Sequence, residues 1–108
     1  MTLTDFEHKF DPGYVLLSTG IQNDREQGLL VDPLLDRHCR GDWGHVSESV
    51  SRINEYGVDN DLQTRVHSSY DTKSFGTIWV ITERHPALFD NAQTTFILKP
   101  EEYPPAQQ

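Results

Sequence analysis

The sequence has little of what a disulfide-linked, zinc-binding or nucleic-acid-binding domain requires. Cys39 is the only cysteine, which excludes an intrachain disulfide and a cysteine-rich zinc site. Lys and Arg number 9 against 17 Asp and Glu, a formal net charge of −8. Direct binding to nucleic acid needs the opposite balance, because basic side chains displace phosphate counterions. We therefore expect no direct contact with nucleic acid.

Long apolar runs are also missing. Runs such as Tyr14 to Leu17 are far shorter than a bilayer requires, and the residues after Met1 mix acids and His8 with apolar side chains, unlike a signal peptide. With no second cysteine, these features predict a cytoplasmic protein in a reducing compartment that makes no membrane contact.

The length of 108 residues and the turn signals predict one domain over residues 14–103. Residues 1–13 form an N-terminal arm that ends in the turn signal Asp11-Pro12-Gly13. Residues 104–108 are polar and proline-rich, which predicts a frayed tail.

The periodicity of the chain predicts an α+β fold, with short helices on one face of a three- to four-stranded antiparallel sheet. A strand is expected at 14–18, followed by helices at 20–27, 32–40 and 48–56. Thr19, Asp32 and Ser47 are the expected N-caps, and Gly28, Gly41 and Gly57 the expected ends. Strands follow at 64–70, 75–82 and 94–99, the last with an exposed edge. In the helix at 48–56, the stripe Val50, Ile53, Asn54 and Tyr56 is expected to face the core.

A possible catalytic or metal-binding cluster comprises His38, Asp42 and His45, with Cys39 beside them and Glu83 later in the chain. These residue types predict a small metal-dependent enzyme or nuclease component only if the loop folds back, since no His-x-x-x-His spacing occurs. A structural interpretation is favoured: His38 is partly buried where its charge complements a helix C-terminus, and Cys39 is an inert thiol. We therefore expect no catalytic residue, no metal, no cofactor and no enzymatic activity.

The acidic residues are the candidate binding residues. They concentrate in two segments, near 20–36 and 42–61, and could form an acidic face that binds a protein with a basic surface. The alternative is that the acidity serves only solubility. The candidates are Asp24, Glu26, Asp32, Asp36, Glu48, Glu55, Asp59 and Asp61.

Two blocks, Arg40-Gly41-Asp42-Trp43-Gly44 and Trp79-Val80-Ile81-Thr82-Glu83, together with the closing segment Thr94 to Tyr103, resemble a family of small bacterial proteins described as plasmid-related or hypothetical. The resemblance spans residues 14–103. The connection His85 to Gln93 is longer than is usual in the family. The resemblance implies a bacterial mobile genetic element, such as a plasmid or phage, and it implies no mechanism.

Small acidic proteins of such elements often inhibit host defences, and some mimic the charge of DNA. By this analogy, we expect an acidic protein-binding module that inhibits a CRISPR or restriction complex by occupying its basic nucleic-acid-binding surface. Two alternatives stay open. One is the metal-dependent enzyme that uses His38, Asp42 and His45. The other is an oligomeric accessory protein, such as a homodimer, paired through the strand edge at 94–99.

Overall fold

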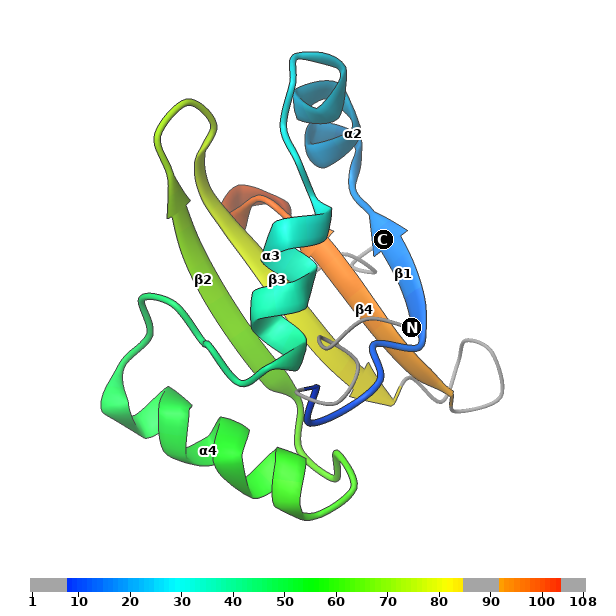
Figure 1. Ribbon diagram of the computed structural model, residues 1–108, viewed down its shortest axis with the longest axis vertical. Helices are drawn as coiled ribbons and strands as arrows, with labels where there is room; N and C mark the ends of the chain where they lie inside the picture. The colour runs from blue at the N-terminus through cyan, green and yellow to red at the C-terminus, as the bar shows by residue number, and fades with distance from the viewer. Residues whose placement is uncertain (1–7, 85–91, 104–108) are drawn as a thin grey trace.

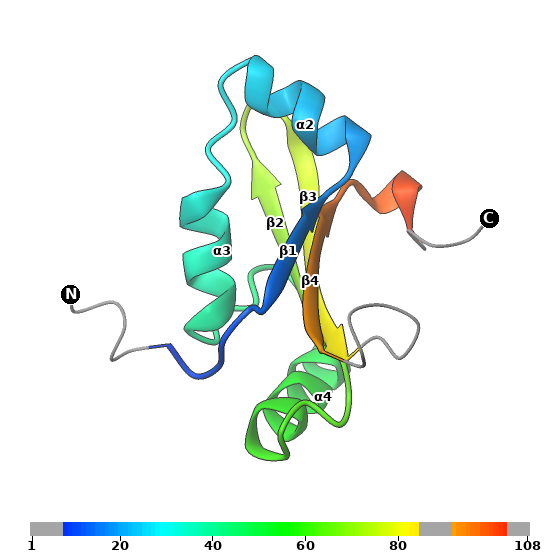
Figure 2. The ribbon, with the colours of Figure 1, turned by 90° about the vertical axis from the view of Figure 1, so that its right-hand side faces the viewer.

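The computed structural model describes residues 8–84 and 92–103, where one helix crosses a face of a β-sheet and one helix lies at each end of it (Figures 1 and 2). Residues 1–7 of the arm expected at 1–13, most of the loop before Gln93 and the tail at 104–108 lie outside the described residues. The elements in chain order are β1 (Tyr14–Leu17), α2 (Thr19–Glu26), α3 (Asp32–Cys39), α4 (Glu48–Asp59), β2 (Val66–Thr72), β3 (Gly76–Arg84), β4 (Gln93–Leu98) and the short 3-10 helix η2 (Pro100–Glu102).

The sheet has four strands in the order β1-β4-β3-β2. β3 pairs antiparallel with both β2 and β4, whereas β1 runs parallel to β4, with Leu16 opposite Phe96. The predicted α+β class is confirmed, with a sheet that is mixed and mostly antiparallel. The expected free edge at 94–99 is wrong, because β4 lies between β1 and β3; the edge strands are β1 and β2.

Both faces of the sheet bury apolar side chains. Between the sheet and α3, Leu34 packs against Ile78, Val80 and Ile97, and Ile21 of α2 closes one end. Alternate residues of the same strands point to the opposite face, as strand geometry requires. There Ile81, Phe96 and Leu98 form a second cluster with Leu16, Trp79 and Tyr103.

The helix boundaries follow the predicted cap residues with three corrections. Ser18, rather than Thr19, caps α2, and its Oγ accepts a hydrogen bond from Ile21 N at 3.2 Å. Asp32 is the first residue of α3 rather than its cap. α4 continues through Gly57 to Asp59, because the missing side chain lets the helix approach Thr64, whose carbonyl oxygen lies 2.9 Å from the position of a Cβ at residue 57.

Glu102 fastens the end of the described chain to the start of α2. Its carboxylate accepts hydrogen bonds from Ser18 Oγ at 2.6 Å, Gly20 N at 2.9 Å and Lys99 N at 2.8 Å. Burial raises the pKa of Glu102, but these donors outweigh it and hold the pKa below its usual value. A carboxylate at a helix N-terminus is also favoured by the helix dipole.

The outer edge of β2 is closed by groups from outside the sheet. Asn54 of α4 accepts from His67 N at 2.9 Å and donates to His67 O at 2.8 Å, so its amide imitates a neighbouring strand. Two residues further along, Ser69 N donates to Trp43 O at 3.0 Å and His45 N donates to Ser69 O at 2.7 Å. The outward peptide groups of β2 at His67 and Ser69 are therefore satisfied.

We predict that Asn54→Ala destabilises the fold by about 2 kcal/mol, because it leaves the N–H and C=O of His67 without partners beneath α4. Urea unfolding followed by circular dichroism measures the change. Asn60→Ala is the matched control, since its amide donates to Tyr56 O at an exposed helix end, and it should cost under about 1 kcal/mol. Equal losses in the two variants would contradict the role of Asn54.

Candidate functional site

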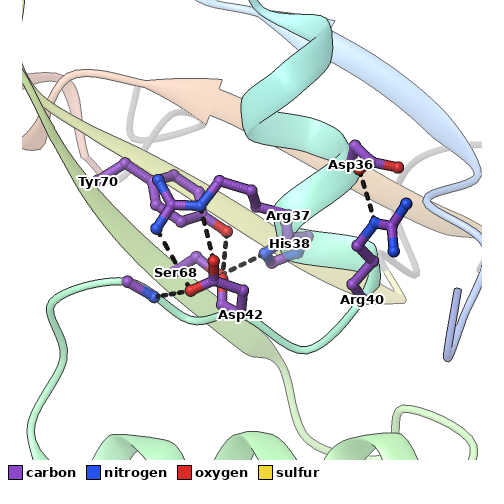
Figure 3. Close-up of polar contacts among 8 residues, drawn as sticks. Asp36, Arg37, His38, Arg40, Asp42, Ser68 and Tyr70 are labelled. Carbon is purple, nitrogen blue, oxygen red and sulfur yellow. Dashed lines mark hydrogen bonds and ion pairs between the residues drawn. The ribbon is translucent and has the colours of Figure 1, made fainter. Parts of the chain in front are cut away.

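His38 lies at the centre of a buried polar network between α3 and the sheet, and Figure 3 shows its contact with Ser68. Its side chain is fully buried. Its Nδ1 pairs with Ser68 Oγ of β2 at 2.6 Å, and its Nε2 pairs with Thr82 Oγ1 of β3 at 2.8 Å. The network continues from Thr82 Oγ1 to Thr95 Oγ1 of β4 at 2.7 Å, and Thr95 donates to Pro12 O at 2.7 Å.

Burial, with a smaller contribution from His67, lowers the pKa of His38 to about 3. The imidazole is therefore neutral at pH 7. The expectation of a charged His38 that complements the helix dipole is wrong, because desolvation outweighs the attraction of the helix C-terminus. With both ring nitrogens bonded to hydroxyl groups, His38 joins the layers of the fold and presents no free nitrogen to a ligand.

The structure does not bring His38, Asp42 and His45 together. Asp42 is exposed and pairs with Arg37, whose Nε lies 2.7 Å from its Oδ2. This pairing lowers the pKa of Asp42. His45 is also exposed, and its Nδ1 lies 3.1 Å from Asp71 Oδ2. Among residues 8–84 and 92–103, no three His, Cys, Asp or Glu side chains lie close enough to hold a metal ion.

Arg37 and Asp42 shape the connection between α3 and α4 (Figure 3). The Arg37 guanidinium lies 4.4 Å from the ring centre of Tyr70, and the Tyr70 hydroxyl donates to Asp42 O at 2.6 Å. Asp42 Oδ1 accepts from Gly44 N at 3.1 Å, which tightens the turn. The neighbouring Trp43 is buried against Leu62 and Val66. The Arg-Gly-Asp-Trp-Gly block is thus a structural connection in this chain.

Cys39 is buried, and burial, with the nearby charges of Asp11 and Asp36, raises its pKa to about 12. A thiol in this state is protonated at pH 7 and is a poor nucleophile. Glu83 follows Thr82 in β3, so its side chain points to the face of the sheet opposite His38, and Arg84 pairs with Asp61 at 3.0 Å. The residues proposed for catalysis therefore lie in separate environments.

The acidic candidates are divided among three helices, because α2 and α4 lie at opposite ends of the sheet and α3 crosses its face (Figure 1). On α2 and α3, Asp24 pairs with Lys99 at 2.5 Å, and Asp36 pairs with Arg40 at 2.7 Å and with His8 at 2.8 Å. Glu26 and Asp32 are exposed. Half of the acids on α2 and α3 are thus paired with partly buried cations, and the eight do not form one continuous face.

The four remaining acids, Glu48, Glu55, Asp59 and Asp61, belong to α4 and the turn after it, and all are exposed. Glu48 pairs with Arg52 at 2.9 Å, but both side chains are at least 74% exposed, so the pair contributes little. Glu55 accepts from Trp43 Nε1 at 2.9 Å, and Asp61 is held by Arg84. Residues 48–61 carry these four acids and one base, a net charge of −3.

The exposed apolar residues of α4 were missed by the sequence analysis. Ile53 and Tyr56, expected to face the core, are each 51% exposed, and Asn54 and Gly57 face the core instead. At 100° per residue, Glu48, Glu55 and Asp59 form a stripe beside this apolar pair. We call Glu48, Ile53, Glu55, Tyr56 and Asp59 the α4 surface. Gly57 was the signal in the sequence that could have identified the buried side of α4. A glycine three residues after Asn54 lies on the same side of the helix and lets that side approach the sheet closely.

Comparisons with protein-family models, with curated proteins and with solved structures found no match to this chain. The family resemblance of the two sequence blocks therefore stays a prediction. Within the part of the chain that the structure describes, no helix has both the length and the apolar character needed to cross a membrane.

We predict that the free energy of unfolding decreases as the pH falls below 6.5. His38 is protonated there in the unfolded chain but stays neutral in the folded state. With its pKa at about 3, His38 accounts for about 2 kcal/mol of lost stability between pH 6.5 and about pH 5. His67, whose pKa is lowered to about 4 by burial and by Arg65, acts in the same direction.

Urea unfolding at a series of pH values measures this dependence. His38→Gln keeps groups that can bond Ser68 and Thr82 but does not titrate, so its stability should fall less steeply with acid. His45→Gln, with its side chain 84% exposed in the parent protein, is the control and should retain the full slope. An unchanged slope in the His38 variant would show that His38 is not the neutral group described.

Proposed function

We propose that the protein is a protein-binding module without catalytic activity, and that the α4 surface binds a partner with a basic surface. The observation that carries the proposal is the exposed pair Ile53 and Tyr56 beside the acidic stripe. Aromatic side chains are enriched at the centre of protein interfaces, and polar side chains at the solvent-accessible rim. The opposite side of α4 is fixed to β2 through Asn54, so the surface is presented on a rigid support.

The two kinds of residue have different roles in this proposal. Ile53 and Tyr56 bury apolar area in the complex and slow dissociation. Glu48, Glu55 and Asp59 attract a basic partner over a distance and raise the rate of association, which makes that rate sensitive to salt. The acids on α2 and α3 contribute less, because Asp24 and Asp36 already have cationic partners.

The partner class follows from the charge and from the family resemblance. We propose a nucleic-acid-processing complex of a bacterial host, such as a CRISPR or restriction complex, with the acidic stripe in the place of a phosphate backbone. This choice rests on analogy with other small acidic proteins of mobile elements.

The first test is recovery of partners from a bacterial lysate with the tagged full chain, at about 50 mM and about 500 mM NaCl, between which surface electrostatics are largely screened. We expect a nucleic-acid-processing complex at low salt that is reduced or lost at high salt. Recovery of no specific protein from hosts that carry such complexes would count against the proposed partner class.

The second test compares two double charge reversals with the recovered partner. Glu48→Lys with Asp59→Lys changes the α4 surface, and Glu26→Lys with Asp32→Lys makes the same change of charge at the other end of the sheet. We expect the first variant to bind at least about tenfold more weakly, a loss of about 1.4 kcal/mol, and the control to bind nearly as the parent does. Equal losses would mean that only net charge matters, and would overturn the assignment to α4.

A further inference from the structure

The two edge strands of the sheet differ in whether other elements bond their outward backbone groups. The edge at β2 is closed by Asn54 and by the segment from Trp43 to His45. No described element covers β1, which Figure 2 shows in front of the sheet. An open edge of this kind is a template for another strand, and proteins usually protect it with Lys, Pro or a bulge. Tyr14–Leu17 contains no Lys and no Pro and pairs with β4 in continuous register.

The outward backbone groups of β1 belong to Val15 and Leu17. Ser18 N donates to Ile97 O of β4 at 3.0 Å, and peptide directions alternate along a strand, so those of Val15 and Leu17 point away from β4. The Leu17 carbonyl accepts from Gln22 Nε2 at 3.0 Å, and a carbonyl has a second lone pair. Among the described residues, no backbone group outside the sheet bonds the N–H or C=O of Val15 or the N–H of Leu17.

An apolar groove runs beside this edge, with a volume of about 440 Å³. Val15 is 38% exposed and Leu30 is 72% exposed, which are large values for aliphatic side chains next to an open strand. Arg25 and Asp32 lie on the rim. The aliphatic side chains of the groove are Val15, Leu17, Leu29, Leu30, Val31 and Leu35.

We propose that β1 pairs antiparallel with β1 of a second copy of this chain, about a two-fold axis at Leu16, to form one sheet across two copies. In this register Val15 faces Leu17 of the second copy, and the two residues exchange N–H to C=O hydrogen bonds on both sides of the axis. The same axis brings the two grooves together, so that Val15 and Leu30 of each copy lose contact with water.

A second copy suits this edge because the edge is complementary to itself. The two residues with outward peptides are separated by one residue, so a two-fold axis through that residue satisfies both. The rim carries one cation and one anion, Arg25 and Asp32, so pairing of two rims brings no excess of like charge together. A partner with a basic surface, as proposed for α4, would find no acidic stripe on β1. The proposal is therefore independent of the proposed function.

Sedimentation equilibrium over about 10 μM to about 1 mM of the full chain tests the pairing, since small interfaces give weak association. We expect the average mass to rise from that of one chain toward that of two. Val15→Lys should weaken association at least about tenfold, because a lysine on the edge blocks strand addition. Leu30→Lys, in the loop before α3, should do the same without any change in the strand. A single-chain mass throughout this range would overturn the proposal.

Amide hydrogen exchange identifies the interface in the same samples. The amides of Val15 and Leu17 should exchange more slowly as the concentration rises, because pairing gives them acceptors. A dimer in which these two amides stay unprotected would overturn the pairing through β1, whatever its mass. Ile53→Lys, with the same change of charge on α4, should leave the mass distribution unchanged while weakening the binding of a basic partner. The failure of one proposal is thus separable from the failure of the other.

Discussion

The arrangement of the layers depends on the hydrogen bonds of His38. Four elements meet through one neutral imidazole: α3, β2, β3 and, through Thr82, β4. A buried polar group is costly unless it is bonded, so the network is stable only in one arrangement. A one-residue slip of β2 or β3 would turn Ser68 or Thr82 to the other face and leave the imidazole unbonded. The polar residues thus fix the register, and the surrounding apolar residues supply most of the stabilisation.

Much of the fold could be predicted from local signals. Alternating β-branched and aromatic residues located β3, and Ser47 and Gly41 located a helix start and a helix end. Local signals could not predict which segments lie next to each other in the fold. The parallel pairing of β1 with β4 joins residues about 80 positions apart, and Glu102, near the end of the described chain, binds the start of α2. Ser68, Thr82 and Thr95 are polar residues at inward positions, but their common partner depends on three-dimensional register.

The type of candidate site could be predicted from the sequence, but its location only in part. Charge alone indicated acidic binding residues, and four of the eight lie on α4 or directly after it. The side of α4 that faces the core was predicted wrongly, because the apolar stripe was expected to pack inward. The helix instead packs through an asparagine and a glycine, which allow a closer approach to β2 than large side chains would. Asn54 satisfies a strand edge there, and Ile53 and Tyr56 are left outside as a consequence.

The two edges of the sheet connect these observations. Closing the edge at β2 with α4 leaves β1 as the only open edge among the described strands. Association at β1 would therefore leave both copies of α4 exposed at the far ends of their sheets. The two associations also differ in their dependence on salt. Binding of a basic partner to the acidic stripe relies on attraction that salt screens, whereas two chains of charge −8 repel each other and gain from the same screening. Opposite responses to salt thus distinguish an interface built on charge from one built on backbone hydrogen bonds and apolar burial.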